Sequence, residues 1–95
     1  MPIIQYDLEK NQSNFEKHGV ALAQAHWLDW GTLWFRKDEI HSDHEERYQG
    51  YAVMNDRLYC VVFTLRDDHY RIISLRKANH REKIRYEKET DYPNR

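Results

Sequence analysis

Basic side chains gather in residues 71–88, where seven lysines and arginines outnumber two glutamates and give a net charge of +5. Arg71 and Arg76 lie near the two ends of a predicted strand that opens this stretch. A guanidinium offers a planar fork of donors that matches two oxygens of a phosphate. Two interpretations of these arginines follow: they bind phosphate, or they form salt bridges with an acidic loop at the rim of the domain.

Cleavage of RNA by internal transesterification is one reaction that such cations could serve. It needs a base for the 2′-OH proton, cations for the charge on the phosphorane and an acid for the 5′-oxygen, and it needs no metal or cofactor. Candidate cations are Arg71, Arg76, Arg47 and Lys17; candidate bases are Glu46, His18 or a lysine; candidate acids are Tyr86 and His80.

Other side chains that often carry chemistry fit structural roles better. His41 and His44 are three residues apart, but a third metal ligand at a recognisable spacing is missing, so a solvated acidic loop over residues 39–46 is expected. Cys60 is the single cysteine, so an internal disulfide is impossible and a small, buried hydrophobic side chain is expected. The tryptophans are expected in the core rather than as platforms for stacking bases.

Length and composition indicate one domain over residues 1–95. The chain has no run of 18 apolar residues and no apolar block behind a basic N-terminus, so neither a membrane span nor a signal peptide is expected. A reducing cytoplasm is the expected location. Residues 38–46 hold five acids and no lysine or arginine, a net charge of −5, which should repel phosphate and acidic partners.

The first third of the chain predicts two helices after a short strand at 3–6. Asp7 suits the N-cap of a helix over 8–18, and Gly19 suits the left-handed residue that closes it. Leu8 and Phe15 mark the apolar side of this helix. A second short helix is predicted over 21–29, with three inward residues: Leu22, Ala25 and Leu28.

The rest of the chain predicts four strands and a last helix. The strands cover 32–36, 47–54, 58–65 and 70–77, with turns at Asn55-Asp56 and Asp67-Asp68, and Asn79 caps a polar helix that reaches residue 89. Four consecutive strands with short turns form an antiparallel meander, and the helices cover it in an α+β two-layer domain. In the last strand, simple alternation places Arg71 and Arg76 on opposite faces.

The sequence resembles the BrnT family of bacterial type II toxins. The matching residues are Tyr6-Asp7, Lys10, Asn14, Lys17-His18-Gly19-Val20, Glu45-Glu46-Arg47, Gly50, Val62-Phe63-Thr64, Arg66, Arg71-Ile72-Ile73-Ser74-Leu75-Arg76-Lys77-Ala78, Arg81-Glu82 and Tyr86. The resemblance extends over residues 4–87, with departures at residues 4–7 and 21–25. It rests on the order and spacing of these residues together, because no single segment is specific.

This resemblance implies a compact RelE-like fold and a ribonuclease that blocks translation. It further implies a BrnA-like antitoxin with a ribbon-helix-helix part, which binds operator DNA for the complex. The expected site residues are Arg71, Arg76, Lys17, Glu46, Arg47, His18 and Tyr86, without a cofactor or metal. Two rival interpretations stay open: a non-catalytic module that binds an antitoxin or acts as corepressor, and a metal-binding domain that uses His41 and His44.

Overall fold

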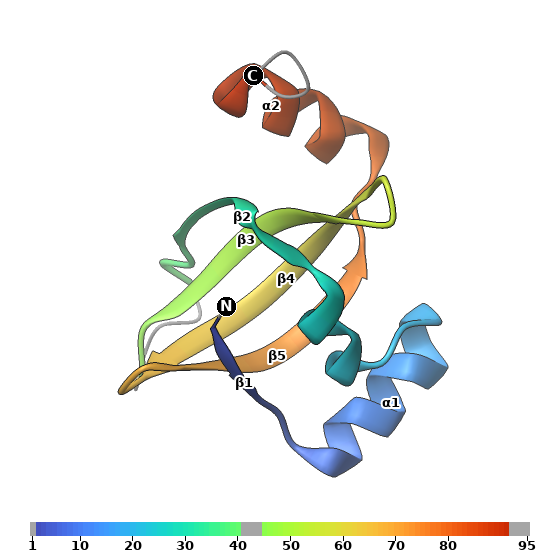
Figure 1. The fold of residues 1–95 in the computed structure, drawn as a ribbon, viewed down its shortest axis with the longest axis vertical. Helices are drawn as coiled ribbons and strands as arrows, with labels where there is room; N and C mark the ends of the chain where they lie inside the picture. Colours follow the sequence, from blue (N-terminus) through green and yellow to red (C-terminus); the bar gives the residue numbers. More distant parts are fainter. Residues whose placement is uncertain (1, 41–44, 92–95) are drawn as a thin grey trace.

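The computed structural model describes residues 2–40 and 45–91 as a sheet with helices at its two ends (Figure 1). The elements in chain order are β1 (Ile3–Gln5), α1 (Leu8–His18), the 3₁₀ helix η1 (Leu22–Trp27), β2 (Asp29–Lys37), β3 (Arg47–Met54), β4 (Arg57–Arg66), β5 (His69–Lys77) and α2 (His80–Thr90). The predicted α+β class is confirmed. Within the described residues, no helix is long and apolar enough to cross a membrane.

The sheet has five strands in the order β1-β5-β4-β3-β2. Strands β2 to β5 form the predicted antiparallel meander, with left-handed turn residues at Asn55, Asp56 and Asp67. The prediction of a purely antiparallel four-stranded sheet is wrong, because β1 pairs in parallel with β5. This pairing gives the first three residues of β5, His69 to Arg71, backbone partners on their outer edge, which an edge strand otherwise lacks.

The predicted second helix forms a six-residue 3₁₀ helix instead of an α-helix. Ala21 at its start has no side chain that can cap the first turn, and the Gln24 side chain accepts a 2.8 Å hydrogen bond from Ala21 N. Short 3₁₀ segments are common where a regular helix is poorly started. The prediction of the inward residues is confirmed, since Leu22, Ala25 and Leu28 are all buried.

Helix α1 has the predicted caps. Asp7 Oδ1 accepts hydrogen bonds from the backbone N–H groups of Glu9 and Lys10, which lower the pKa of this carboxyl, and Gly19 closes the helix with φ +74°. The predicted apolar side is wrong, since Leu8 is 77% exposed and Phe15 is 52% exposed.

The residue that docks α1 is the buried Asn14. Its amide nitrogen donates 2.7 Å hydrogen bonds to Val20 O and to Leu75 O in β5. Asn11, one turn earlier, accepts a 2.8 Å hydrogen bond from Ala23 N. The helix is therefore held by polar contacts with backbone groups, which a search for apolar periodicity does not detect.

The main core lies on one face of the sheet, which we call the core face. It includes Ile72 and Leu75 from β5 and Phe63 and Val61 from β4, packed against Leu22 and the other apolar residues around η1. Trp30 from β2 meets Tyr70 from β5 edge-on at 5.0 Å between ring centroids, although β3 and β4 lie between these strands in the pairing order. The sheet therefore curls strongly around this core.

Candidate functional site

The opposite face of the sheet carries most of the polar candidates, and we call it the α2 face. Strand pairing assigns to it Trp34 and Arg36 of β2, Arg47, Gln49 and Tyr51 of β3, Cys60, Val62 and Thr64 of β4, and Arg71, Ser74 and Arg76 of β5. Helix α2 packs on one end of this face, where Tyr86 contacts Tyr51 and Cys60. Figure 1 shows α2 beyond one end of the strands, so no helix of the described residues covers the other end of this face.

A β-bulge in β5 changes the predicted alternation. Val62 pairs with Ser74 and the next residue, Phe63, pairs with Ile72, so Ile73 has no partner on β4. A bulge of this kind inserts one residue and inverts the alternation beyond it. The prediction that Arg71 and Arg76 lie on opposite faces is therefore wrong: both belong to the α2 face.

Three of the α2-face side chains form a row across β3, β4 and β5. Arg47 pairs with Thr64, and Thr64 pairs with Arg71. Paired residues of neighbouring strands point to the same side, with Cβ atoms about 4.5–5.5 Å apart. Two arginines thus flank one threonine, and the sequence-predicted cations Arg47 and Arg71 are brought together.

Thr64 in the middle of this row is 2% exposed. Within residues 2–40 and 45–91 its hydroxyl makes no hydrogen bond of normal geometry. The Glu45 carboxylate is near enough for Thr64 to contribute to the lowered pKa of Glu45, but the contact falls outside hydrogen-bond limits. The buried hydroxyl thus lies beside the Glu45 carboxylate, between the two arginines of the row.

Glu45 is the carboxylate beside this row. It accepts hydrogen bonds from Arg66 Nε at 2.6 Å and Arg66 Nη2 at 3.2 Å, and Arg66 is the main cause of its lowered pKa. Arg71 also lowers the pKa of Glu45 through its charge. Glu45 is absent from the site residues expected from the sequence. Its position two residues before Arg47 could have indicated it, because side chains two residues apart in an extended segment point to the same side.

Glu46, the predicted carboxylate, lies elsewhere. It accepts a 2.7 Å hydrogen bond from the Tyr48 hydroxyl and is 3.5 Å from Lys37 Nζ. These two contacts lower the pKa of Glu46, and the same hydrogen bond raises the pKa of Tyr48. Tyr48 and Lys37 are paired on the core-face side of β3 and β2, so Glu46 is not brought to the row.

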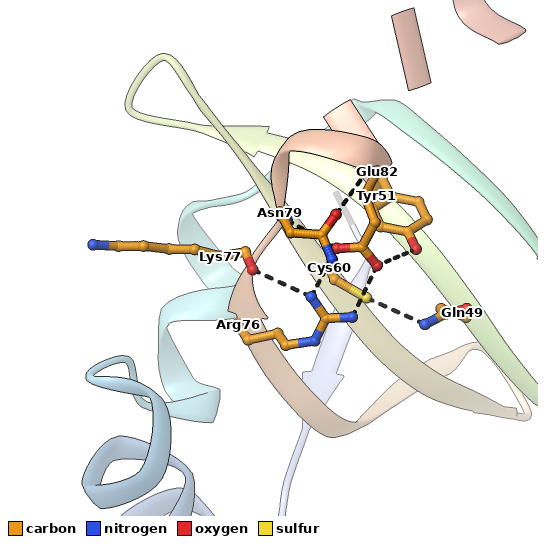
Figure 2. Close-up of polar contacts among 7 residues, drawn as sticks. All are labelled: Gln49, Tyr51, Cys60, Arg76, Lys77, Asn79 and Glu82. Atoms are coloured by element: carbon orange, nitrogen blue, oxygen red, sulfur yellow. Dashed lines mark hydrogen bonds and ion pairs between the residues drawn. The ribbon is translucent and has the colours of Figure 1, made fainter. Parts of the chain in front are cut away.

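Arg76 is bound to the first turn of α2 (Figure 2). Its Nη1 and Nη2 donate to the two carboxylate oxygens of Glu82 at 2.8 and 2.9 Å. Glu82 also accepts a 2.7 Å hydrogen bond from the Tyr51 hydroxyl and a 2.9 Å hydrogen bond from Asn79 N. One carboxylate therefore joins β5, β3 and the N-terminus of α2.

The pKa values of this group follow from these contacts. The Arg76 guanidinium lowers the pKa of Glu82 to about 2, against the cost of partial burial. The pKa of Arg76 is raised by the same bidentate pair. The pKa of Tyr51 is raised by burial and then by its hydrogen bond to Glu82. At neutral pH the pair is fully ionised and the tyrosine is neutral.

Cys60 completes the group as a buried thiol. It is 1% exposed, burial raises its pKa, and Gln49 Nε2 donates to its Sγ at 3.6 Å. A raised pKa favours the protonated thiol, and the predicted burial of Cys60 is confirmed. Figure 2 shows the sulfur between Gln49 and the Arg76–Glu82 pair.

Tyr86 is part of the small core under α2 rather than of an exposed site. Its side chain is 1% exposed, and its hydroxyl donates a hydrogen bond to Thr32 O in β2. The tyrosine therefore fastens the helix to the sheet at the end opposite to Arg47 and Arg71.

Lys17 and His18 form the last turn of α1, next to β5 at the edge of the antiparallel strands. Figure 1 shows the C-terminal end of α1 on the opposite side of the view from the β4–β5 turn, near which Arg71 lies. The structure thus does not group these two residues with Arg47 and Arg71.

Metal ligands are not gathered in the described part of the chain: no three of its histidine, cysteine, aspartate and glutamate side chains are placed to hold an ion. The predicted pair His41 and His44 lies outside the described residues.

Comparison with known proteins identifies the family. No curated protein matches the chain. A family model described as the ribonuclease toxin BrnT of type II toxin–antitoxin systems matches residues 6–82, which include the row on the α2 face, Arg76 and Glu82. This match covers well over half of the sequence and agrees with the resemblance that the residues themselves indicated. The chain therefore belongs to the BrnT family of type II ribonuclease toxins, whose members have an antitoxin partner.

Proposed function

We propose that this protein is an RNA endonuclease toxin that cleaves RNA by metal-independent transesterification and thereby inhibits translation. The observation that carries the proposal is the row of Arg47, Thr64 and Arg71 on the α2 face. Two guanidiniums on either side of a buried hydroxyl can place several donors around one phosphate. Family membership supports the reaction class, and the row supports this position for it.

Arg71 is the cation best placed to bind the scissile phosphate. In the ranges that the structure describes, it makes no ion pair with a carboxylate, so its donors are free for a ligand. Arg76, five residues later on the same face, gives two donors to Glu82. We assign Arg71 and Arg47 to direct contact with the phosphate. We assign Arg76 to stabilisation of the phosphorane charge without direct contact, and to the positioning of α2.

The acid–base groups are assigned by position on the α2 face. Glu45 is ionised at neutral pH and lies beside the row, so we assign it, in place of Glu46, as acceptor of the 2′-OH proton. Tyr86 is buried and hydrogen-bonded, and its proposed role is to hold α2. In this proposal, Lys17 and His18 at the end of α1 bind phosphates of the RNA other than the scissile one.

The partner in this proposal is a BrnA-like antitoxin with a ribbon-helix-helix part. The toxin meets operator DNA only through that antitoxin. The substrate is cytoplasmic RNA, and the basic α2 face is the surface that the antitoxin must block.

The rival function is a non-catalytic module that only binds its antitoxin. It is favoured by the binding of Arg76 to Glu82, because a cation held by a carboxylate has less charge to offer a phosphorane. This alternative predicts tight antitoxin binding without growth arrest when the protein is expressed alone.

Expression of the protein without antitoxin separates the two functions. Wild type should arrest growth and fragment cellular RNA, and purified protein should cleave RNA in the presence of a chelator. Arg71→Ala should lower cleavage by about a hundredfold if it removes charge-assisted hydrogen bonds to the scissile phosphate. Arg57→Ala is the matched control, since Arg57 is exposed at the start of β4 and pairs with Met54 of the core face.

Cleavage that survives alanine substitution of both Arg47 and Arg71 would contradict this site. Growth that continues normally while purified wild-type protein leaves RNA intact would instead favour the non-catalytic module.

A further inference from the structure

A cleft separates α2 from β2 and β3 at the margin of the α2 face. It has a volume of about 210 Å³ and is lined by Trp34, Arg36, Gln49, Tyr51, Arg81, Glu82 and Arg85. Three of these seven side chains are arginines from two distant parts of the sequence. None of the three belongs to the row of Arg47, Thr64 and Arg71.

The positive charge of this cleft is not neutralised by its own walls. Glu82 is the one acid that lines it, and both oxygens of Glu82 are engaged by Arg76. Across the described ranges, neither Arg36 nor Arg85 forms an ion pair with a carboxylate. The cleft thus carries the charge of three guanidiniums, which favours an anionic ligand.

An aromatic ring holds two of these guanidiniums in place. The Cζ atoms of Arg85 and Arg36 lie 5.7 and 5.9 Å from the centroid of the Trp34 ring. Trp34 in turn stacks on Tyr51 at 6.0 Å with an interplanar angle of 23°. Guanidiniums over an aromatic ring keep their donors outward while the ring orients them.

This combination fits one nucleotide of single-stranded RNA. Grooves for single strands pair cationic side chains for the phosphates with flat π surfaces for the bases. The cleft offers both, and Arg36 pairs with Gln49, which is two residues from Arg47 on the same side of β3. From Arg47 to Tyr51, β3 extends about 13 Å, a span that a short RNA strand can follow.

We propose that the cleft is an RNA-binding subsite beside the cleavage position, where Arg36, Arg81 and Arg85 bind a phosphate and the guanidinium planes that Trp34 orients support a stacked base. This inference rests on the proposed ribonuclease function and adds a subsite to it. An acidic segment of a partner protein is the competing occupant of such a cleft. RNA is favoured because Gln49, which lines the cleft, is two residues from Arg47 of the row on the same sheet face, and because planar guanidiniums held over a ring can stack on a base as well as bind a phosphate.

The test measures binding of a labelled 2′-O-methyl RNA oligonucleotide, about eight nucleotides long, which cannot be cleaved by transesterification. Fluorescence anisotropy should show that Arg36→Ala and Arg85→Ala each weaken binding about tenfold. The slope of log affinity against log salt should become shallower by about 0.7 for each phosphate that the variant no longer binds. Arg36→Lys should keep the slope but lose affinity, because lysine keeps the charge without the stacked planar fork.

Three controls make the outcome decisive. Arg57→Ala should leave binding unchanged, and thermal unfolding should show that each variant folds. In cleavage assays, Arg85→Ala should raise KM more than it lowers kcat. Wild type that cleaves RNA while the arginine variants bind the oligonucleotide as tightly as wild type would overturn the subsite and leave the ribonuclease function standing.

Two further results separate the alternatives. Loss of binding to a polyglutamate peptide, with RNA binding intact in the same variants, would overturn the subsite in favour of an acidic protein partner. Binding that depends on Arg36 and Arg85 in a wild type that cleaves no RNA would support the subsite and contradict the ribonuclease function.

Discussion

Arg71 and Arg76 lie on the same face of β5 although they are five positions apart. In a regular strand an odd spacing places two side chains on opposite faces. Ile73 is the extra residue of a bulge, so the core receives Ile72 and Leu75 while the α2 face receives both arginines. The bulge therefore reconciles a continuous core with a continuous basic surface.

The two arginines should differ in what their removal does to stability. Arg76→Ala leaves the partly buried Glu82 carboxylate without its cation, and the free energy of unfolding should fall by about 2 kcal/mol. Arg71→Ala removes no ion pair among the described residues and should leave stability within about 0.5 kcal/mol of wild type. Urea denaturation checks both, and equal losses would contradict the assignment.

Glu82 should make the protein less stable in acid. Its pKa is about 2 in the folded state against an ordinary value of 4.5, so its contribution is complete above pH 4.5 and is lost as the pH falls from 4.5 toward 2. The shift corresponds to at most about 3 kcal/mol. Thermal unfolding from pH 7 to about pH 2.5 should show this loss.

Glu82→Gln should be less stable than wild type at pH 7 and should lose less stability on acidification. Glu45→Gln is the matched control, because the Glu45–Arg66 pair is exposed and should contribute little. A Glu82→Gln variant with the same pH profile as wild type would show that another carboxyl dominates acid unfolding.

Asn14 should be essential for the docking of α1. Asn14→Ala leaves Val20 O and Leu75 O without the amide that donates to them, and should cost about 2–4 kcal/mol. Asn14→Asp should cost more, since an ionised carboxylate cannot donate to two carbonyl oxygens. Ser13→Ala, on the exposed side of the same helix, is the control. Retained stability in Asn14→Ala would mean that other contacts dock α1.

Gly50 should tolerate no side chain. A Cβ atom at this position would lie 2.7 Å from Leu33 Cδ1 and 3.1 Å from Phe35 Cβ, so Gly50→Ala should destabilise the fold by about 1–3 kcal/mol. Gly31→Ala is the control in β2, where the nearest atom is the Asp29 carboxylate at 3.1 Å in an exposed segment. Comparable Tm values for the two variants would contradict tight packing at Gly50.

Tyr86→Phe should act on stability rather than directly on chemistry. The substitution removes one hydrogen bond to Thr32 O and should lower the free energy of unfolding by about 1 kcal/mol. Cleavage by the folded variant should keep the pH profile of wild type. A large loss of kcat at unchanged stability would instead show that Tyr86 is the general acid.

Local signals in the sequence are sufficient for most of the secondary structure. Asp7 and Asn79 cap their helices as predicted, and Asn55 and Asp56 form the left-handed turn. Each of these features depends on a few neighbouring residues, which is why the sequence predicts them. The predicted strands 47–54 and 70–77 agree within one residue with β3 and β5 for the same reason.

The errors concern interactions between distant residues. The buried side of α1 depends on Asn14 reaching Leu75, and no local pattern encodes that hydrogen bond. The bulge at Ile73 depends on the register against β4, so alternation assigns the arginines to the wrong faces. Glu45 and Glu46 are adjacent carboxylates, and only their contacts in the fold separate them: Glu45 binds Arg66, whereas Glu46 binds Tyr48 and lies near Lys37.

The same distant contacts set the order in which the protein can form during synthesis. Asn14 meets Leu75 across 61 positions, and Tyr86 meets Thr32 across 54. Interactions between such distant positions form slowly, because a long loop must close before they give any stabilisation. A nascent chain that stops before β5 lacks the strand that pairs with β1, the Leu75 carbonyl that binds Asn14, and Arg71 of the row. Completion of the fold and assembly of the Arg47–Thr64–Arg71 row therefore occur together, late in translation.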